Sequence, residues 1–210
     1  MTAVDRTKYM DDREVQAQRT VTEAHAITDL QAGRCRGVLT WAVVDVALQT
    51  GLRASELVRL TVGDFDPRRL ALRVWRHKRR EHGQETIAIS KTLTKHLREF
   101  IRWKRTVEQR TDKDARLFVG KRGPLSKRGL QAIWKGAVKR AGLPAELSIH
   151  SARHTMAVHL LRQSGNLRMV QKQLGHGSPA TTANMYADIS FEDMQAGVDG
   201  LYGIKRDGNV

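Results

Sequence analysis

The stretch VLTWAVVDVALQTGLRASEL, residues 38–57, decides the fold of this chain. Residues 38–48 are apolar on nearly every side, a pattern typical of a helix buried in the centre of a domain. Gly51 suits the position just after that helix, where the backbone often becomes left-handed. A short second helix is expected from about residue 53 to 60. We therefore expect the rest of the chain to pack around one central helix.

Further helices and one small sheet are predicted on either side of this stretch. Thr20 or Thr22 can cap a helix whose apolar face would hold Ala24, Ile27 and Leu30. Alternating residues at 72–74 and 87–89 predict two antiparallel strands, joined by a basic hairpin at 76–83. Serine caps and apolar spacing predict later helices from Ser90, from Ser126, from Ser148 or Ser151, at 167–174, around Tyr186 and at 191–201. The predicted fold class is mainly α with a small antiparallel β-sheet.

Length and composition limit the classes of protein that this chain can belong to. Its 210 residues are near the usual size of one domain, and 40% are hydrophobic, which excludes wholesale disorder. The longest apolar stretch is too short to span a membrane, and no signal segment opens the chain. The single cysteine, Cys35, fits a reducing compartment. We expect a cytoplasmic protein without membrane contacts.

The chain is strongly basic. It has 37 Lys and Arg residues against 22 Asp and Glu residues, which gives a formal net charge of +15. A single domain with this charge points to a polyanionic partner. The alternative is a generic basic surface.

Three motifs far apart in the sequence carry residues suited to phosphate chemistry: Thr50-Gly51-Leu52-Arg53 with Glu56, His150-Ser151-Ala152-Arg153-His154, and Leu174-Gly175-His176 with Tyr186 ten residues later. Glu56 lies where it can hold the Arg53 guanidinium, and His150 is one helical turn from Arg153. Two fixed guanidiniums suit a phosphodiester, because their forks match its oxygens and stay charged. Taken alone, each motif also has a plainer interpretation, as an ion-paired surface group or a satisfied histidine.

Together and in this order, the motifs resemble the boxes of the tyrosine recombinase (phage integrase) family. The resemblance covers about residues 22–190 and implies the fold of that family's catalytic domain. We divide the chain into a flexible arm at 1–20, which could also be a frayed helix, a catalytic domain at 21–190 and a tail at 191–210. The apolar stripe of the tail would pack on its own core or on a neighbouring protomer. The chain resembles the short recombinases that consist of the catalytic domain alone.

The resemblance implies a site-specific recombinase or integrase that cleaves and rejoins DNA through a 3′-phosphotyrosine. The two arginines would clamp the scissile phosphate, with a further hydrogen bond from the histidine of the third box. Tyr186 would attack the phosphorus, His150 would assist removal of its proton, and Lys78 on the hairpin would protonate the leaving 5′-oxygen. The expected site residues are Arg53, Lys78, His150, Arg153, His176 and Tyr186, supported by Glu56 and His154.

No metal or other cofactor is expected, since the guanidiniums take the role of a Lewis acid. The spacing of His150 and His154 is also found in zinc sites, but Ser151 stands where the zincin motif has glutamate. Three pairs of carboxylates fall in segments where such residues usually cap helices or stabilise turns: Asp11 with Asp12, Asp64 with Asp66, and Asp112 with Asp114.

The predicted partner is double-stranded DNA, bound mainly through its phosphates and with strong salt dependence. By resemblance, DNA would assemble four protomers, while the free protein could be a monomer. The cations expected to contact the DNA backbone, or else to form a solvated charged face, are Arg79, Arg80, Lys121, Arg122, Lys127 and Arg128.

Two other functions stay open at this point. A type IB topoisomerase-like enzyme shares the chemistry but would relax DNA as a monomer. A DNA-binding regulator on the same fold would be catalytically idle, because the spacing of His176 and Tyr186 is one residue longer than is common in the family. One extra residue turns a helix by about 100°.

Overall fold

The computed structural model describes residues 9–77 and 82–175 of the chain. The order of elements confirms the predicted class, a mainly helical fold with small antiparallel sheets. The elements are α1 (Asp12–Gln31), α2 (Arg36–Thr50), α3 (Ala54–Leu57), a 3₁₀ turn (Val62–Asp64), β1 (Phe65–Asp66), β2 (Ala71–His77), β3 (His82–Ala88), α4 (Lys91–Thr106), β4 (Val119–Gly120), β5 (Gly123–Pro124), α5 (Lys127–Arg140), α6 (Ile149–Ser164) and α7 (Leu167–Leu174).

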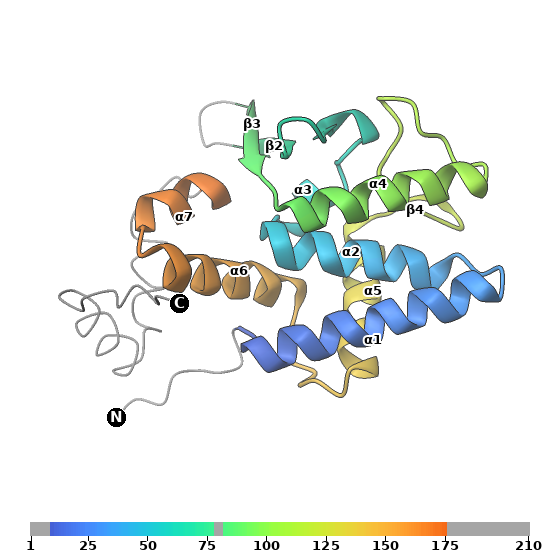
Figure 1. Cartoon of the computed structure of the whole chain (residues 1–210), viewed down its shortest axis with the longest axis horizontal. Coiled ribbons are helices and arrows are strands. Elements are labelled where there is room, and N and C mark those ends of the chain that lie inside the picture. Colours follow the sequence, from blue (N-terminus) through green and yellow to red (C-terminus); the bar gives the residue numbers. More distant parts are fainter. Residues whose placement is uncertain (1–8, 78–81, 176–210) are drawn as a thin grey trace, which may run out of the picture.

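Helix α2 lies at the centre of the fold, as its apolar composition predicted. Nearly all of its residues are buried, and α1, α4, α5 and α6 pack on it (Figure 1). It ends at Gly51, whose φ of +63° lies in the left-handed region that favours glycine. Because the burial of α2 fixes its carboxyl end, it also fixes the start of the loop that carries the first motif.

None of the described helices is both long and apolar enough to span a membrane.

Helix α1 begins earlier than the predicted cap at Thr20 or Thr22. Asp11 and Glu14 form a capping box, in which each side chain accepts the backbone N–H of the other residue at 2.9 Å. Residues 12–20, expected in a flexible arm or a frayed helix, are therefore the first half of α1. The sequence contains this capping signal as Asp11-x-x-Glu14. It was not used to predict the start of the helix, because the residues around it show no apolar helical period.

The inner face of α1 is mostly polar, which corrects the expected apolar face. Ile27 and Leu30 are 52% and 56% exposed. Asp29 is buried instead, and its carboxylate accepts the Gly37 backbone N–H at 2.7 Å. A Cβ atom at Gly37 would lie 2.5 Å from the His25 carbonyl oxygen. The two helices approach so closely that a face of large apolar side chains would not fit between them.

The predicted hairpin belongs to a three-stranded antiparallel sheet with the order β1-β2-β3. Val74 on β2 lies opposite Glu85 on β3, and Arg76 lies opposite Gly83. Side chains alternate along β2, so that Val74 and Arg76 are buried while Trp75 is exposed. The two-residue strands β1, β4 and β5 were not predicted, because two residues are too few to show a period.

Serine side chains begin three later helices, as predicted. Ser90 accepts the Leu93 N–H at 2.9 Å, and Ser126 accepts the Gly129 N–H at 3.1 Å. Ser148, rather than Ser151, is the cap of α6. Helix α3 spans only residues 54–57, so the predicted helix at 53–60 was too long.

A small core of its own joins α6 to α7, made of Ala157, Leu161, Val170 and Leu174. Figure 1 shows this pair at one end of the molecule, next to the β2–β3 hairpin. The predicted helix around Tyr186 and the tail at 191–210 lie outside the described residues.

Candidate active site

Arg53 lies at the junction between the central helix and α3. Its backbone N–H donates to Glu56 Oε2 at 2.8 Å, and its Nη1 donates to Glu56 Oε1 at 2.9 Å. The Arg53 side chain is 41% exposed, whereas the Glu56 carboxylate is buried. The three-residue spacing therefore does what the sequence indicated, since Glu56 holds the guanidinium of an arginine whose side chain stays partly exposed.

Arg153 comes from α6 and is only 7% exposed. Its Nη1 donates to the Gly51 carbonyl and its Nη2 to the Leu174 carbonyl, each at 2.8 Å. Burial, together with the nearby Arg53 cation, lowers the pKa of Arg153 to about 10, so the group stays charged at neutral pH. A single side chain thus joins the first, second and third motifs.

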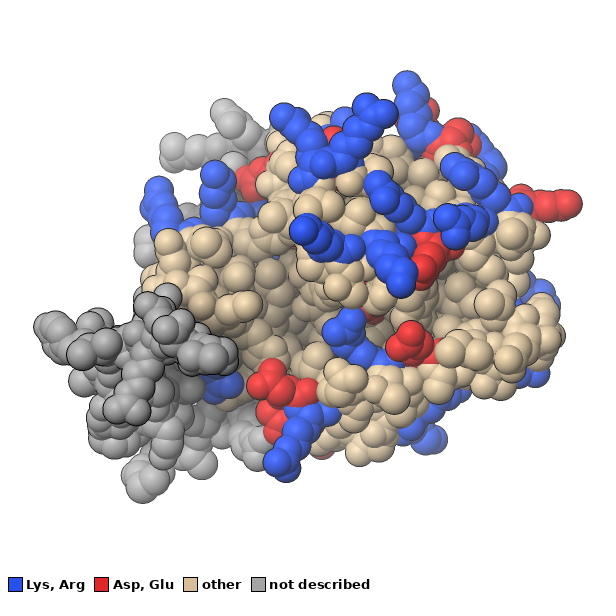
Figure 2. All heavy atoms as spheres, viewed as in Figure 1, with Lys and Arg blue, Asp and Glu red and all other residues tan. Residues whose placement is uncertain are grey.

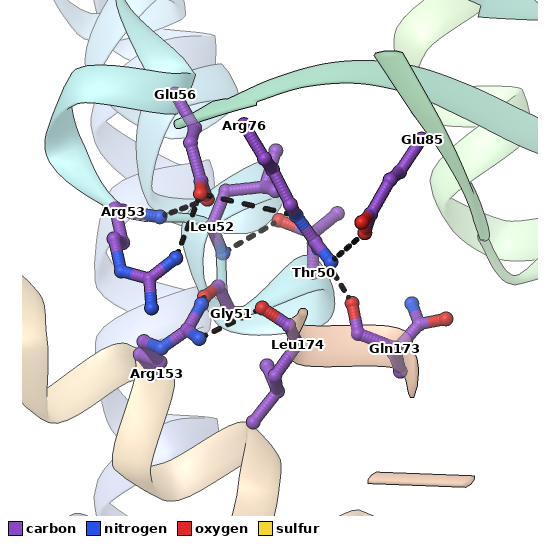
Figure 3. Close-up of polar contacts among 10 residues, drawn as sticks. All are labelled: Thr50, Gly51, Leu52, Arg53, Glu56, Arg76, Glu85, Arg153, Gln173 and Leu174. Atoms are coloured by element: carbon purple, nitrogen blue, oxygen red, sulfur yellow. Dashed lines mark hydrogen bonds and ion pairs between the residues drawn. The ribbon is translucent and has the colours of Figure 1, made fainter. Parts of the chain in front are cut away.

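The guanidiniums of Arg53 and Arg153 lie next to one another beside Gly51 (Figure 3). A third guanidinium, that of Arg76, is close enough to lower the pKa of Arg153 as well. Two carboxylates, Glu56 and Glu85, accompany the three cations. A bound anion would relieve the repulsion among these cations, so the arrangement favours a phosphate group.

Two residues of this cluster, Arg76 and Glu85, were not among the predicted site residues. Arg76 was treated only as part of a basic hairpin, yet its side chain is 3% exposed. The signal was its position on β2, because Leu72, Val74 and Arg76 alternate and so share one face of the strand. Because the hairpin contains so many basic residues, it was interpreted as one basic segment, and the alternation along β2 was not recognised.

The remaining expected site residues are only partly described. His150 is exposed on the first turn of α6, and His154 is half-buried on the next. Lys78, Arg79 and Arg80 on the hairpin, and His176 and Tyr186 after α7, lie outside the described residues. Their predicted roles stay predictions.

Basic side chains gather on the upper part of the face shown in Figure 2, around α4, with several acidic side chains among them. Four predicted DNA contacts are exposed: Lys121 and Arg122 in the β4–β5 turn, and Lys127 and Arg128 in the first turn of α5. A stripe of exposed cations that was not among the predicted DNA contacts recurs every three or four residues along α4: Lys91, Lys95, Arg98, Arg102 and Arg105.

Several of the acidic residues set aside as caps and turns do serve in this way. Asp64 accepts the Thr61 N–H at 2.9 Å, and Asp66 accepts the Arg69 N–H at 3.0 Å. Asp112 is bound by the Arg110 side chain and accepts the Asp114 N–H. Within residues 9–77 and 82–175, no three His, Cys, Asp or Glu side chains gather as metal ligands could.

Comparison with known proteins places the site in a family context. A model of the Phage integrase family matches residues 13–193. Tyrosine recombinase XerC of Herpetosiphon aurantiacus is 36% identical over 155 residues, which are 73% of this chain and 49% of that protein. Tyrosine recombinase XerC of Actinobacillus pleuropneumoniae is 32% identical over 184 residues, 87% of this chain and 55% of that protein. The chain spans about half the length of the curated relatives it matches.

Solved structures share the fold. The XerA recombinase superposes with a TM-score of 0.74 at 22% identity, over 93% of this chain and 65% of that one. The XerH site-specific recombinase, in a pre-cleavage complex with difH substrate, superposes with a TM-score of 0.70 at 18% identity, over 91% of this chain and 53% of that one.

Proposed function

The chain belongs to the phage integrase family of tyrosine recombinases, and on this premise we propose that it cleaves and rejoins DNA strands through a 3′-phosphotyrosine intermediate. The observation that carries the proposal is the meeting of Arg53 and Arg153. A hydrogen bond between residues 102 positions apart, Arg153 and Gly51, brings them together. Two cations held side by side, with N–H groups to spare, suit the oxygens of one phosphodiester.

The arginines stabilise the charge that develops on the phosphate during attack. Each positioned donor of this kind is typically worth about 10²–10³ in rate. His176 adds a further hydrogen bond to the same phosphate. Because Arg153 is fixed by two backbone carbonyls, its remaining N–H groups are aimed before the substrate arrives.

Tyr186 supplies the nucleophile. Its phenol has a pKa of about 10, so only about a thousandth is ionised at neutral pH and the attack needs a base. His150 accepts the phenol proton while the tyrosine oxygen bonds to phosphorus. The bond from phosphorus to the 5′-oxygen breaks, and Lys78 gives a proton to that oxygen. The products are a 3′-phosphotyrosine and a free 5′-hydroxyl.

The reverse step uses the same groups. The 5′-hydroxyl of another strand attacks the phosphotyrosine, and the tyrosine leaves with its proton restored. The energy of the original phosphodiester is kept in the covalent intermediate, so strand exchange proceeds without a nucleotide cofactor. No metal is part of this proposal.

The proposed partner is double-stranded DNA, and the proposed assembly is four protomers on two duplexes in the cytoplasm, at the nucleoid. The net charge of +15 and the exposed cations of α4 and α5 support DNA binding. The XerH recombinase, which shares the fold, has been crystallised with its DNA substrate. Lys121, Arg122, Lys127 and Arg128, together with Arg79 and Arg80, are the proposed phosphate contacts.

The test is covalent capture on nicked DNA. A library of duplexes, randomised around a nick that lets the cleaved fragment diffuse away, is incubated with the protein and resolved under denaturing conditions. We expect a denaturant-resistant protein–DNA adduct that is lost in Tyr186→Phe. Tyr202→Phe removes the same hydroxyl from a tyrosine outside the motif, and it should leave the adduct unchanged.

Other outcomes identify the rival functions. Binding without any adduct from the library would support an idle DNA-binding regulator and contradict the proposal. Relaxation of supercoiled DNA by isolated monomers, without exchange between paired sites, would support a topoisomerase instead.

A further inference from the structure

Glu56 is a buried carboxylate that faces two guanidiniums at once. Its Oε1 accepts a hydrogen bond from Arg53 Nη1 at 2.9 Å and lies 3.8 Å from Arg76 Nε. Its Oε2 accepts the Arg53 backbone N–H at 2.8 Å. The carboxylate is 5% exposed, so water cannot easily replace a partner that it loses. Its Oε1 therefore has one bonded cation and a second cation close by (Figure 3).

Arg76 brings an unused hydrogen-bond donor to this carboxylate. Its Nη1 donates to Glu85 Oε2 at 2.6 Å, and its Nη2 donates to the Gln173 carbonyl at 2.7 Å. Its Nε is buried, and within the part of the chain that the structure describes this atom has no hydrogen-bond partner. Leaving a buried donor without a partner costs about 1–3 kcal/mol, so each such donor calls for an explanation.

The surroundings of Arg76 keep this donor in place. Glu85 on β3 and Gln173 near the end of α7 hold its two terminal nitrogens. Gly175 follows at φ +66°, and a Cβ atom there would clash with the Arg76 guanidinium. The 3.8 Å between Arg76 Nε and Glu56 Oε1 is only slightly more than the length of a hydrogen bond. A small turn of the Glu56 carboxylate would therefore close the gap.

Arg53 is the partner that can leave Glu56. Its side chain is 41% exposed, and its guanidinium lies beside that of Arg153 at the proposed phosphate site (Figure 3). Turning both Nη atoms toward phosphate oxygens draws Nη1 away from Glu56. With no second cation nearby, this movement would leave a buried carboxylate unpaired, which is strongly destabilising.

We propose that Arg76 is a positioning residue for Arg53: when the scissile phosphate draws Arg53 away from Glu56, Arg76 Nε donates to Glu56 Oε1 in its place. This inference rests on the proposed function, in which Arg53 binds the scissile phosphate. The hydrogen bond that Glu56 loses is replaced, so Arg53 can turn to the phosphate without leaving a buried charge unpaired. Arg76 acts through Glu56 and does not contact the DNA.

The first test needs no DNA, because Arg53→Ala removes the first partner of Glu56 outright. A double-mutant cycle of Arg53→Ala and Arg76→Gln is followed by urea unfolding at neutral pH. Where Arg76 is present, Arg53→Ala should raise the unfolding equilibrium constant by no more than about fivefold, because Arg76 takes over Glu56. In the Arg76→Gln background the same change should raise it by about 30-fold, because Glu56 then has neither guanidinium.

The second test is single-turnover cleavage of the nicked duplex selected from the library. Saturating DNA is used, so that a change in affinity does not enter the rate. Arg76→Gln should slow cleavage by about tenfold or more, which is part of the contribution of about 10²–10³ expected from Arg53. In the Arg53→Ala background, Arg76→Gln should slow cleavage by less than about a further threefold, because residues that act as a unit are not additive.

Arg110→Gln is the matched control. It removes another arginine that pairs with a carboxylate, Asp112, outside the proposed site and the proposed DNA contacts. Its effect on unfolding should be independent of Arg53→Ala, and it should cleave like the wild type. Arg76→Lys keeps the positive charge, but its single nitrogen cannot serve every partner of the guanidinium. It should therefore show coupling to Arg53→Ala of the same sign, and it replaces Arg76→Gln in both tests if that variant does not fold.

Additive effects on unfolding would overturn the inference, because Glu56 would then not pass from Arg53 to Arg76. Losses of cleavage that multiply would overturn it as well, because Arg76 would then act independently of Arg53. A wild-type protein that forms no adduct would instead overturn the proposed function, and this inference with it, whatever the unfolding measurements show.

Discussion

Arg53 and Arg153 meet beside Gly51, but the protein holds them in different ways. Arg153 is buried and donates to two backbone carbonyls, so its removal leaves both oxygens without that donor. A buried group left unsatisfied costs about 1–3 kcal/mol. Arg53 is partly exposed, and its carboxylate partner, Glu56, also faces the Arg76 cation. Arg153 therefore supports the fold as well as the site, whereas Arg53 supports mainly the site.

Alanine substitutions should separate these two roles. Arg53→Ala is expected to slow cleavage by about 10²–10³ while lowering the free energy of unfolding by no more than about 1 kcal/mol. Arg153→Ala should lose cleavage and also about 2–5 kcal/mol of stability. Urea unfolding and adduct formation on nicked DNA measure the two effects. Equal losses of stability in both variants, or a loss of DNA affinity that matches the loss of cleavage, would contradict this assignment.

At the scale of elements, a buried lysine fastens α4 to the segment that leads into β4. Lys104 Nζ donates to the Arg116 carbonyl at 2.6 Å and to the Leu117 carbonyl at 2.9 Å. Burial lowers the pKa of Lys104 from 10.5 to about 8. The charged form is therefore less stable in the folded protein than in the unfolded chain, even though it satisfies two carbonyl oxygens.

This shift predicts a pH dependence of stability. Below pH 8, folded and unfolded chains both carry the charge, and the full cost of burying it is present. Between pH 8 and 10.5 the unfolded chain binds more protons, so the contribution of Lys104 to the free energy of unfolding rises with pH, by up to about 3 kcal/mol. In Lys104→Met this rise should be absent, whereas Lys95→Met, on the exposed face of the same helix, should retain it. If the free energy of unfolding depended on pH in the same way in the wild type and in Lys104→Met, the result would contradict a buried charge at Lys104.

At the scale of the whole molecule, four exposed cations lie in the segment where α5 begins. Two lie in the β4–β5 turn and two in the first turn of the helix, where the helix dipole adds positive charge. The other end of α5 carries exposed Lys139 and Arg140. The same helix thus offers two pairs of cations, of which only the first is expected to bind DNA phosphates.

Salt titrations should distinguish the two pairs. Replacing Lys127 and Arg128 together by alanine should reduce the slope of log affinity against log salt concentration by about 2, because each lost phosphate contact removes about one unit. The matched double variant of Lys139 and Arg140 should change the slope by less than about 0.5. Equal changes would show a diffuse basic surface rather than a phosphate-binding face. Cleavage at saturating DNA should be preserved in both variants.

Local sequence patterns predicted many of the helices, strands and short-range contacts of this protein. The buried helix α2, the serine caps of α4, α5 and α6, the β2–β3 pairing and the Arg53–Glu56 contact all depend on residues a few positions apart. Spacing and chemical type are enough to predict such contacts. The order of the three motifs also identified the family, and the net charge of +15 pointed to a polyanion.

Only the tertiary structure decided what lies between distant segments. It placed Asp29 rather than Ile27 against α2, attached Arg153 to the carbonyls of Gly51 and Leu174, and buried Arg76 against the end of α7. Each of these contacts depends on how closely two backbones approach, which no periodicity within one segment encodes. The sequence by itself therefore determined the main helices and strands and the chemical types of the site residues. Packing between distant segments determined which of the charged side chains at the site are buried.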